Sequence, residues 1–349
     1  MINISGLSEK LNIPGLLKTN SSREKEPVTQ TGRIPLQPFW VMVQKEITDH
    51  MRSWRFIILL GIIVLTCTGS LYTSLSSLSE SGRAGDSENS FFFLNLFTLS
   101  DGTLPSFVIF ISFLGPLLGI SLGFDAINSE QSRGTLSRVM AQPIPRDYLL
   151  NAKFVAGIAV VGGMFFTLSF LVIGTGLIAI GIPPTAEEFM RIIFYTLLSI
   201  VYVSFWLNLS IFFSVRFRQS ATSALAGIAV WLFFTVFYPL IVNIILKSFQ
   251  PSEYSPPAAI YFYQKIKFGL MQVMPGELFN EVTSTLLVPT VRSLGPLTME
   301  QLHGAIPGAL PLGQSLLLVW PQLTGLIALT LLCFMFSYIS FMRREIRSR

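Results

Sequence analysis

Six long apolar stretches, separated by more polar segments, dominate the sequence. Each is about 20 residues long or longer, which is the length an α-helix needs to cross the hydrocarbon core of a membrane. The stretches lie at residues 56–75, 105–124, 154–181, 192–213, 220–246 and 316–341. This pattern predicts an all-α integral membrane protein with six transmembrane helices, whose two termini lie on the same side of the membrane.

Two different patterns precede the first apolar stretch. Residues 1–35 are rich in Ser, Thr, Lys, Glu and Pro and show no sustained periodicity, which predicts a flexible tail. Residues 36–55 instead repeat with a helical period. Their apolar side chains are Phe39, Val43, Ile47 and Met51, and the charged ones on the other face are Lys45, Glu46, Asp49 and Arg52. This segment is predicted to be an amphipathic helix that lies in the membrane interface.

The connections on the opposite side of the membrane are longer. The 247–315 segment is too long for a turn and rich in proline, so we expect a small region of short helices there. One such helix is expected from Pro275 to just before Pro289. Its apolar face would hold Leu278, Phe279, Val282 and Leu286, opposite Glu277 and Glu281. The phenylalanines at 91–97 are expected to insert into the interface or to pack on this larger loop.

Composition and charge set the orientation. Hydrophobic residues make up 51% of the chain and charged ones 12%, whereas soluble domains carry about 25% charged residues. Basic residues near helix ends mark the cytoplasmic side. The arginines that flank the apolar stretches are Arg52, Arg55, Arg133, Arg138, Arg216, Arg218, Arg343, Arg344, Arg347 and Arg349. We therefore expect a multi-pass protein of the plasma (cytoplasmic) membrane with both termini, including the 1–35 tail, in the cytoplasm. These basic residues are spread over several loops, which argues against nucleic-acid binding.

Several kinds of chemistry have no motif in the sequence. There is no Gly-x-x-x-x-Gly-Lys-Ser/Thr loop, no His-Glu-x-x-His, no Gly-x-Ser-x-Gly and no metal-type Cys or His spacing. We expect no catalytic residue, metal site or cofactor in this chain. The six apolar stretches also hold no Asp, Glu, Lys, Arg or His, which ion-coupled carriers normally carry at mid-membrane. This disfavours a secondary carrier and favours an external energy source.

Two sets of residues within the apolar stretches are candidates for packing or transport. Gly115, Gly119 and Gly123 recur every four residues and leave one helix face bare, for close packing inside the chain or against a second subunit. The polar side chains Tyr202, Asn208, Tyr238 and Asn243 either form hydrogen bonds between helices or line a substrate path. A mostly apolar, Phe-rich interior suits an amphipathic or lipid-like cargo better than a free ion.

The charged 125–153 segment connects the second and third apolar stretches. We expect residues 125–142 to continue as helix beyond the membrane until Pro143 and Pro145 break it, and a short second helix to run from Pro145 to Lys153. Two helices joined at a bend and rooted in two spans would convert a push from below into tilting of both spans. The alternative is an ordinary solvated run of charges near the lipid headgroups.

The order of residues in this segment supports the first interpretation. It resembles the first cytoplasmic loop of permease subunits of ABC transporters of the type 2 export class (ABC-2), in which a Glu, a Gly-Thr-Leu, a Pro and two basic residues recur. The matching positions are Glu130, Gly134, Thr135, Leu136, Pro143, Arg146 and Lys153. The Pro-Gly-Glu-Leu-Phe-Asn-Glu run at 275–281 and the Leu-Leu-Val-Pro at 286–289 are similar to the outer loop of one branch, which includes the nitrous-oxide-reductase maturation permease.

This resemblance implies an architecture. Residues 56–349 would form a six-helix ABC-2 type transmembrane domain, preceded by an N-terminal amphipathic elbow helix at 36–55. The 125–153 segment would be a cytoplasmic coupling elbow with a coupling helix, and 247–315 a small extracytoplasmic loop region. The residues expected to couple to the ATPase are Glu130, Arg133, Gly134, Thr135, Leu136, Arg138, Pro143, Arg146 and Lys153.

The resemblance also implies partners and a function. The chain would be the permease of an ATP-driven exporter, in which a separate cytoplasmic ABC ATPase subunit binds ATP and Mg²⁺ and a second permease copy or a paralogue completes the pathway. The alternative is a mechanotransmitting or scaffolding subunit, which passes the ATPase-driven movement through the 247–315 loop to an extracytoplasmic protein without moving a cargo.

Overall fold

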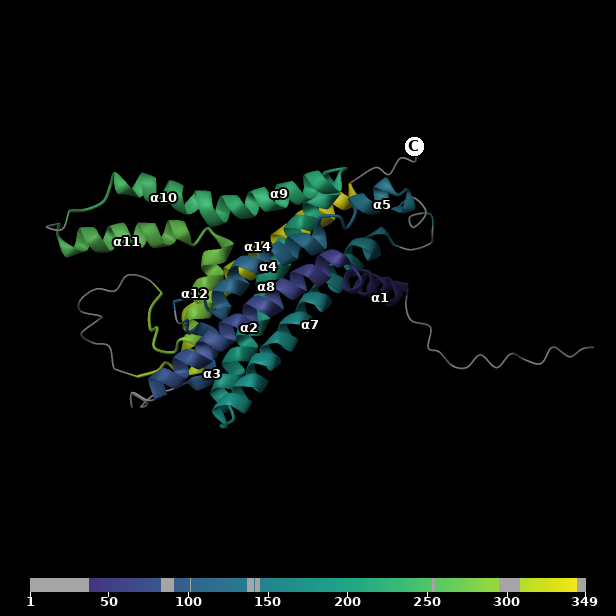
Figure 1. Ribbon diagram of the computed structural model, residues 1–349. Helices are drawn as coiled ribbons and strands as arrows, with labels where there is room; N and C mark the ends of the chain where they lie inside the picture. The colour runs from purple at the N-terminus through teal and green to yellow at the C-terminus, as the bar shows by residue number, and fades with distance from the viewer. Residues whose placement is uncertain are drawn as a thin grey trace, which may run out of the picture. The chain divides into compact units, whose positions relative to one another are not determined.

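The computed structural model describes residues 38–82, 91–100, 102–136, 141, 145–252, 255–294 and 308–343. Within these ranges every regular element is a helix, which confirms the predicted all-α fold (Figure 1). The predicted tail at 1–35 lies outside the described residues.

Six helical segments of the described chain are long and apolar enough to cross a membrane, as the sequence predicts. Four of them lie in the helices α2 (Trp54–Gly82), α7 (Arg146–Ile180), α8 (Ala186–Arg216) and α14 (Leu312–Met342), and the segment Phe107–Ser132 begins with α4 (Phe107–Gly123). The sixth runs in one line through α9 (Ser220–Leu232), the π-helix η1 (Phe233–Phe237) and α10 (Tyr238–Lys247) (Figure 1).

The centre of the bundle is α8, which packs against α4 on one side and α14 on the other. The predicted glycine face of α4 lies on α8. A Cβ atom at Gly119 would lie 2.6 Å from the carbonyl oxygen of Val203, and one at Gly123 would lie 2.7 Å from that of Leu207. Gly115 is less crowded, since its Cβ would lie 3.0 Å from a Val203 methyl group. The glycine spacing is therefore used within the chain, where it lets two backbones touch.

The first helix, α1 (Pro38–Met51), lies within the predicted amphipathic helix at 36–55 but ends four residues earlier, and its buried face differs from the predicted one. Val43 and Glu46 are buried, whereas Met51 is 53% exposed. The placement of Glu46 on the polar face is wrong, because α1 packs against α7 and Glu46 there meets the ammonium group of Lys153. Val43 contributes to the same contact, packing with Ala152 and Ala156 of α7.

The opposite end of the bundle carries three shorter helices, α3 (Phe92–Thr98), α11 (Pro257–Met271) and α12 (Pro275–Leu287). The phenylalanines of α3 pack on protein, and Phe97 meets the rings of Phe107 and Tyr195 edge-on. In α12 the predicted apolar face is buried, but Glu281 is also buried, at 7% exposure, where it accepts a hydrogen bond from Gln272. The expectation that Glu281 lies opposite the buried face is therefore wrong.

Arg191 holds this end together. The sequence places the start of its span at residue 192, but α8 begins at Ala186 and Arg191 is completely buried. Its guanidinium pairs with Glu187 at 2.8 Å and donates to the carbonyl oxygens of Leu286 at 2.9 Å and Leu310 at 2.5 Å. Because Leu286 lies in the last turn of α12, the arginine caps that helix and ties it to α8.

The α4–α8 contact gives a testable prediction for stability. Gly119→Ala would force the two backbones apart, and overpacking of this kind costs about 1–3 kcal/mol. Gly163→Ala in α7 is the matched control, because no atom lies within 4 Å of its added Cβ. We expect a lower melting temperature of the purified protein for the first variant and an unchanged or slightly higher one for the second. Equal melting temperatures would contradict the close contact.

Candidate functional site

The 125–153 segment begins with a break in the helix rather than the predicted continuation. After α4 ends at Gly123, residues 124–127 form turns before a short helix begins, α5 (Asn128–Ser132). The break has a clear cause. The Ser214 hydroxyl of α8 accepts hydrogen bonds from the backbone N–H groups of Ile127, at 2.8 Å, and Asn128, at 3.2 Å. In a continuous helix these groups would instead reach back to the carbonyls of the preceding turn. The prediction of one helix over 125–142 is therefore wrong.

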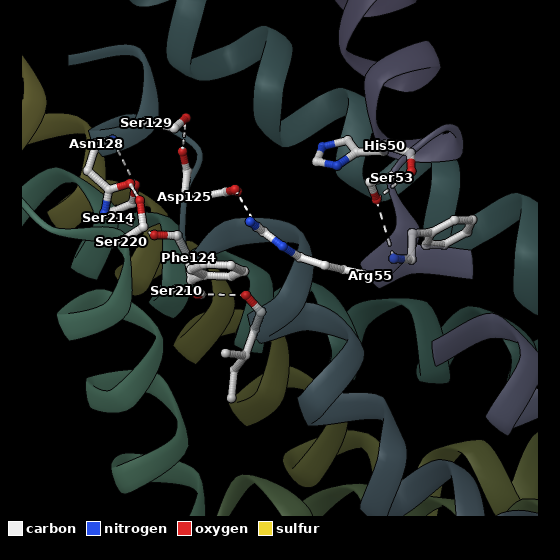
Figure 2. Close-up of polar contacts among 12 residues, drawn as sticks. His50, Ser53, Arg55, Phe124, Asp125, Asn128, Ser129, Ser210, Ser214 and Ser220 are labelled. Carbon is white, nitrogen blue, oxygen red and sulfur yellow. Dashed lines mark hydrogen bonds and ion pairs between the residues drawn. The ribbon is translucent and has the colours of Figure 1, made fainter. Parts of the chain in front are cut away.

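Side chains hold α5 in this position. The Asn128 side chain donates to the carbonyl oxygen of Phe124 at 3.1 Å and accepts from the Ser220 hydroxyl at 2.9 Å. Figure 2 shows Asn128 and Ser220 beside Ser214, so that groups from α5, α8 and the start of α9 meet. One turn earlier on α8, Ser210 donates to the carbonyl oxygen of Ile120 at 3.0 Å. The base of the 125–153 segment is thus anchored to α8 and α9.

A second anchor comes from α2. Arg55 and Asp125 form an ion pair of 2.6 Å, and the guanidinium of Arg55 lies over the ring of Phe124, 4.8 Å from its centroid (Figure 2). Arg55 is largely exposed, so the ion pair adds at most about 1 kcal/mol to stability. It does fix where the start of α2 lies relative to the end of α4.

The third anchor is a buried ion cluster. The ammonium group of Lys153 lies 2.8 Å from Glu130 of α5 and 2.9 Å from Glu46 of α1, and only 6% of the lysine side chain is exposed. Burial alone would raise the pKa of Glu46, but Lys153 and the neighbouring Lys45 hold that pKa below its ordinary value. The second carboxylate oxygen of Glu130 is buried and has no hydrogen-bond partner among the described residues. One lysine of α7 thereby joins α1 and α5.

The end of the segment also differs from expectation. The predicted short helix from Pro145 to Lys153 is not a separate element, since α7 runs without interruption from Arg146 to Ile180. Pro145 occupies the N-cap position, and neither proline nor glycine follows before Gly157, so nothing ends the helix near Lys153. A force on Arg146 therefore acts on the whole 35-residue helix.

The residues predicted to couple to an ATPase fall into two groups. Arg133, Gly134, Thr135 and Arg146 are exposed, and Gly134 has a φ of 68°, which lets the chain turn directly after α5. Glu130, Leu136 and Lys153 are instead turned into the protein. Arg138 and Pro143 lie outside the described residues. Five further residues of this site were not predicted from the sequence: Glu46, Arg55, Asp125, Asn128 and Ser214. Their one signal in the sequence is the pair of serines, Ser210 and Ser214, four residues apart on α8.

The four predicted substrate-path residues do not meet in one place. Tyr202 donates to the carbonyl oxygen of Ser112 at 3.1 Å, Asn208 to that of Thr330 at 3.3 Å, and Tyr238 to that of Leu270 at 2.9 Å. Asn243 is exposed. Three of them thus form hydrogen bonds between helices, and Tyr202 alone also lines a large cavity.

Comparison with known protein families identifies the family of this chain. The model of the family described as "ABC-2 family transporter protein" matches residues 40–346, nearly the whole described chain. The chain belongs to the ABC-2 transporter family.

Two curated proteins similar to this chain are permeases of ABC transporters. Both are described as "Probable ABC transporter permease protein NosY". The one from Pseudomonas aeruginosa is 27% identical over 218 residues, which cover 60% of this chain and 72% of the relative. The one from Stutzerimonas stutzeri is 27% identical over 218 residues, which cover 59% and 70%. This ABC-2 protein is a multi-pass membrane subunit of an ABC transporter, and members of its family carry no nucleotide-binding domain of their own.

The buried cluster of this ABC-2 subunit predicts a large and specific stability effect. Lys153→Met would leave the buried carboxylate of Glu130 without a cation and that of Glu46 with only the exposed Lys45, and breaking a buried pair in this way costs about 3–5 kcal/mol. The control is Lys45→Met, because Lys45 also pairs with Glu46 but its side chain is 63% exposed, so its loss should cost less than about 1 kcal/mol. Thermal unfolding of the purified variants measures both.

A rescue variant separates charge from packing. Adding Glu46→Gln and Glu130→Gln to Lys153→Met removes all three charges, and replacing a whole buried ionic group is often close to neutral. We expect the triple variant to recover most of the lost melting temperature. If the triple variant melts as low as Lys153→Met alone, the cluster stabilises the protein through side-chain packing and not through its charges.

Proposed function

We propose that this chain is the membrane-spanning permease of an ATP-binding cassette exporter, with both termini in the cytoplasm of a cell whose plasma membrane it spans. A separate ATPase subunit binds ATP and Mg²⁺, and the 125–153 segment receives its movement. One observation carries the proposal. This single segment is bonded to α1 through Lys153, to α2 through Asp125, and to α8 and α9 through Asn128, and it continues directly into α4 and α7.

The arrangement suits a mechanical input. Arg133, Thr135 and Arg146 are exposed at the tip of the segment, where a cytoplasmic partner could bind. Behind them, Lys153 and Glu130 join the segment to α1, so that a push would move these helices together. Buried polar contacts of this kind hold only in a narrow range of geometries, which favours discrete movement over gradual deformation.

A second permease copy or a paralogue is part of this proposal. Little of α9 and α10 is buried within the chain, and α10 exposes Leu240, Ile241, Ile244 and Ile245. These side chains would face lipid or the second subunit. An amphipathic cargo would then pass between the two copies.

The test is co-purification of an ATPase with the tagged chain from mild detergent. The double charge reversal Arg133→Glu with Arg146→Glu should reduce the recovered ATPase activity by about tenfold, because interface charges of the wrong sign repel the partner. Both side chains are exposed, so the fold should persist, whereas reversal at Glu130 would disrupt the buried cluster.

The control is Lys265→Glu with Lys267→Glu, the same charge change on α11 at the other end of the bundle. It should leave recovery unchanged. A wild-type chain that purifies alone, without ATP hydrolysis, would overturn the proposal, and equal losses in both double variants would show that the site lies elsewhere.

One observation favours the alternative, a subunit that transmits movement without cargo. Arg191 connects α8 to the carbonyl oxygens of both Leu286 and Leu310, so a shift of α8 is passed to the α12 region. Arg191→Met should uncouple movement of α8 from the α12 region. If the chain transmits movement without cargo, ATP should then no longer change the protease sensitivity of α12, while ATP hydrolysis stays intact. Stimulation of ATPase activity by a transported compound would instead support export.

A further inference from the structure

A cavity of about 500 Å³ opens between α4, α8, the η1–α10 segment and α12. Its size falls within the range of about 300–1,000 Å³ that small-molecule sites occupy. Neither the 125–153 segment nor the buried Lys153 cluster contributes to it. Its lining includes Ser112, Phe113, Tyr202, Trp206, Phe234 and Glu277.

The charge of the cavity is unusual. Among the described residues that line it there is no lysine, arginine or histidine, and Glu277 is the only one with a formal charge. Glu277 is partly buried and forms no ion pair or side-chain hydrogen bond with the described part of the chain. Burial raises its pKa, because no nearby cation compensates for the lost solvent. A carboxylate placed in this way would be stabilised by a positively charged ligand and would repel a negatively charged one.

Aromatic rings supply the rest of the wall. Phe113, Tyr202, Trp206 and Phe234 contribute from three helical segments, and the faces of such rings attract cations as well as apolar groups. A polar contact joins two sides of the cavity, since the Ser112 hydroxyl of α4 donates to the side-chain oxygen of Asn280 in α12 at 2.9 Å. The lining thus combines one acidic group, several rings and a few hydroxyl groups.

The backbone beside the cavity departs from the α-helix. Pro239 has no N–H to donate to the carbonyl of Thr235, and the turn before it is the π-helix η1, in which Tyr238 donates to Phe233. Thr235 and Pro239 both line the cavity. Single π-helical turns of this kind occur frequently at functional sites.

We propose that this cavity binds an organic monocation with an apolar body, the cationic group pairing with Glu277 and the body lying among the four aromatic rings. The inference that this cation is the cargo rests on the export function proposed above. The binding itself requires neither ATP nor the ATPase, so it succeeds or fails independently of export.

The experiment measures binding to the full-length wild-type protein in phosphatidylcholine nanodiscs, with empty nanodiscs subtracted. Three probes of similar shape are compared by displacement of labelled tetraphenylphosphonium: phenylbutyltrimethylammonium, the neutral phenylbutanol and the anionic phenylbutyrate. We expect the cation to bind about tenfold more tightly than either of the others. Equal affinities would overturn the proposal and indicate a site for any apolar body, such as a lipid chain.

Variants locate the site. Glu277→Gln should weaken binding of the cation about tenfold and leave binding of the alcohol unchanged. The control is Glu281→Gln, one turn further along α12, which does not line the cavity and should weaken binding of the cation much less than Glu277→Gln does. A cation affinity that is the same in Glu277→Gln and wild type would overturn the proposal.

A cavity-filling variant gives an answer even if Glu277→Gln does not fold. Ile109 lies on the cavity wall with 56% of its surface exposed, so Ile109→Trp should fold and occlude the space. We expect it to abolish displacement by all three probes. Unchanged binding of the cation would place its site elsewhere and overturn the proposal.

Discussion

The buried ammonium group of Lys153 is the constraint on which one end of this molecule depends. A charge removed from water requires opposite charges close by, and here they come from two other helices, α1 and α5. If either helix moved away from α7, the buried Lys153 would lose one of its two carboxylate partners. The amphipathic helix, the short α5 and the start of α7 therefore behave as one body, although the sequence separates them widely.

The other end is held by different chemistry. Arg191 has one carboxylate partner, and its remaining bonds go to backbone carbonyls and the Ser315 hydroxyl, so it caps a helix as much as it balances a charge. Between these two ends, α4 and α8 touch through glycine, and the hydroxyl groups of Tyr202 and Ser210 on α8 donate hydrogen bonds to backbone carbonyls of α4. A bundle that is tightly packed in its middle and bonded through charged groups at its ends can pass movement along its length.

The spans could be predicted from the sequence because hydrophobic length is a local property, and the glycine face of α4 because four-residue spacing is also local. The break after Gly123 could not be predicted, since its cause is a hydroxyl at Ser214, far along the chain. The same holds for Glu46, which follows a polar pattern on its own helix but finds Lys153 on another. Arg191 was left out of the predicted apolar stretch because a charged residue next to an apolar run normally marks the end of a transmembrane helix. In each case a side chain from a distant helix overrides the local pattern.

The π-helix in the fifth span has a consequence for how this segment tolerates change in length. A π turn holds one residue more than the α-helical turn it replaces, so η1 is equivalent to an insertion between α9 and α10. Removing one residue from 233–237 would convert this wide turn into an ordinary α-helical turn, and α9 and α10 would keep nearly the same orientation. Tyr238 would then still reach the carbonyl of Leu270, and α11 would keep that attachment. Removing a residue from α9 or α10 instead would rotate all later residues of the span by about 100° relative to those before it. The π turn is therefore the place in this span where a change of one residue in length disturbs the packing least.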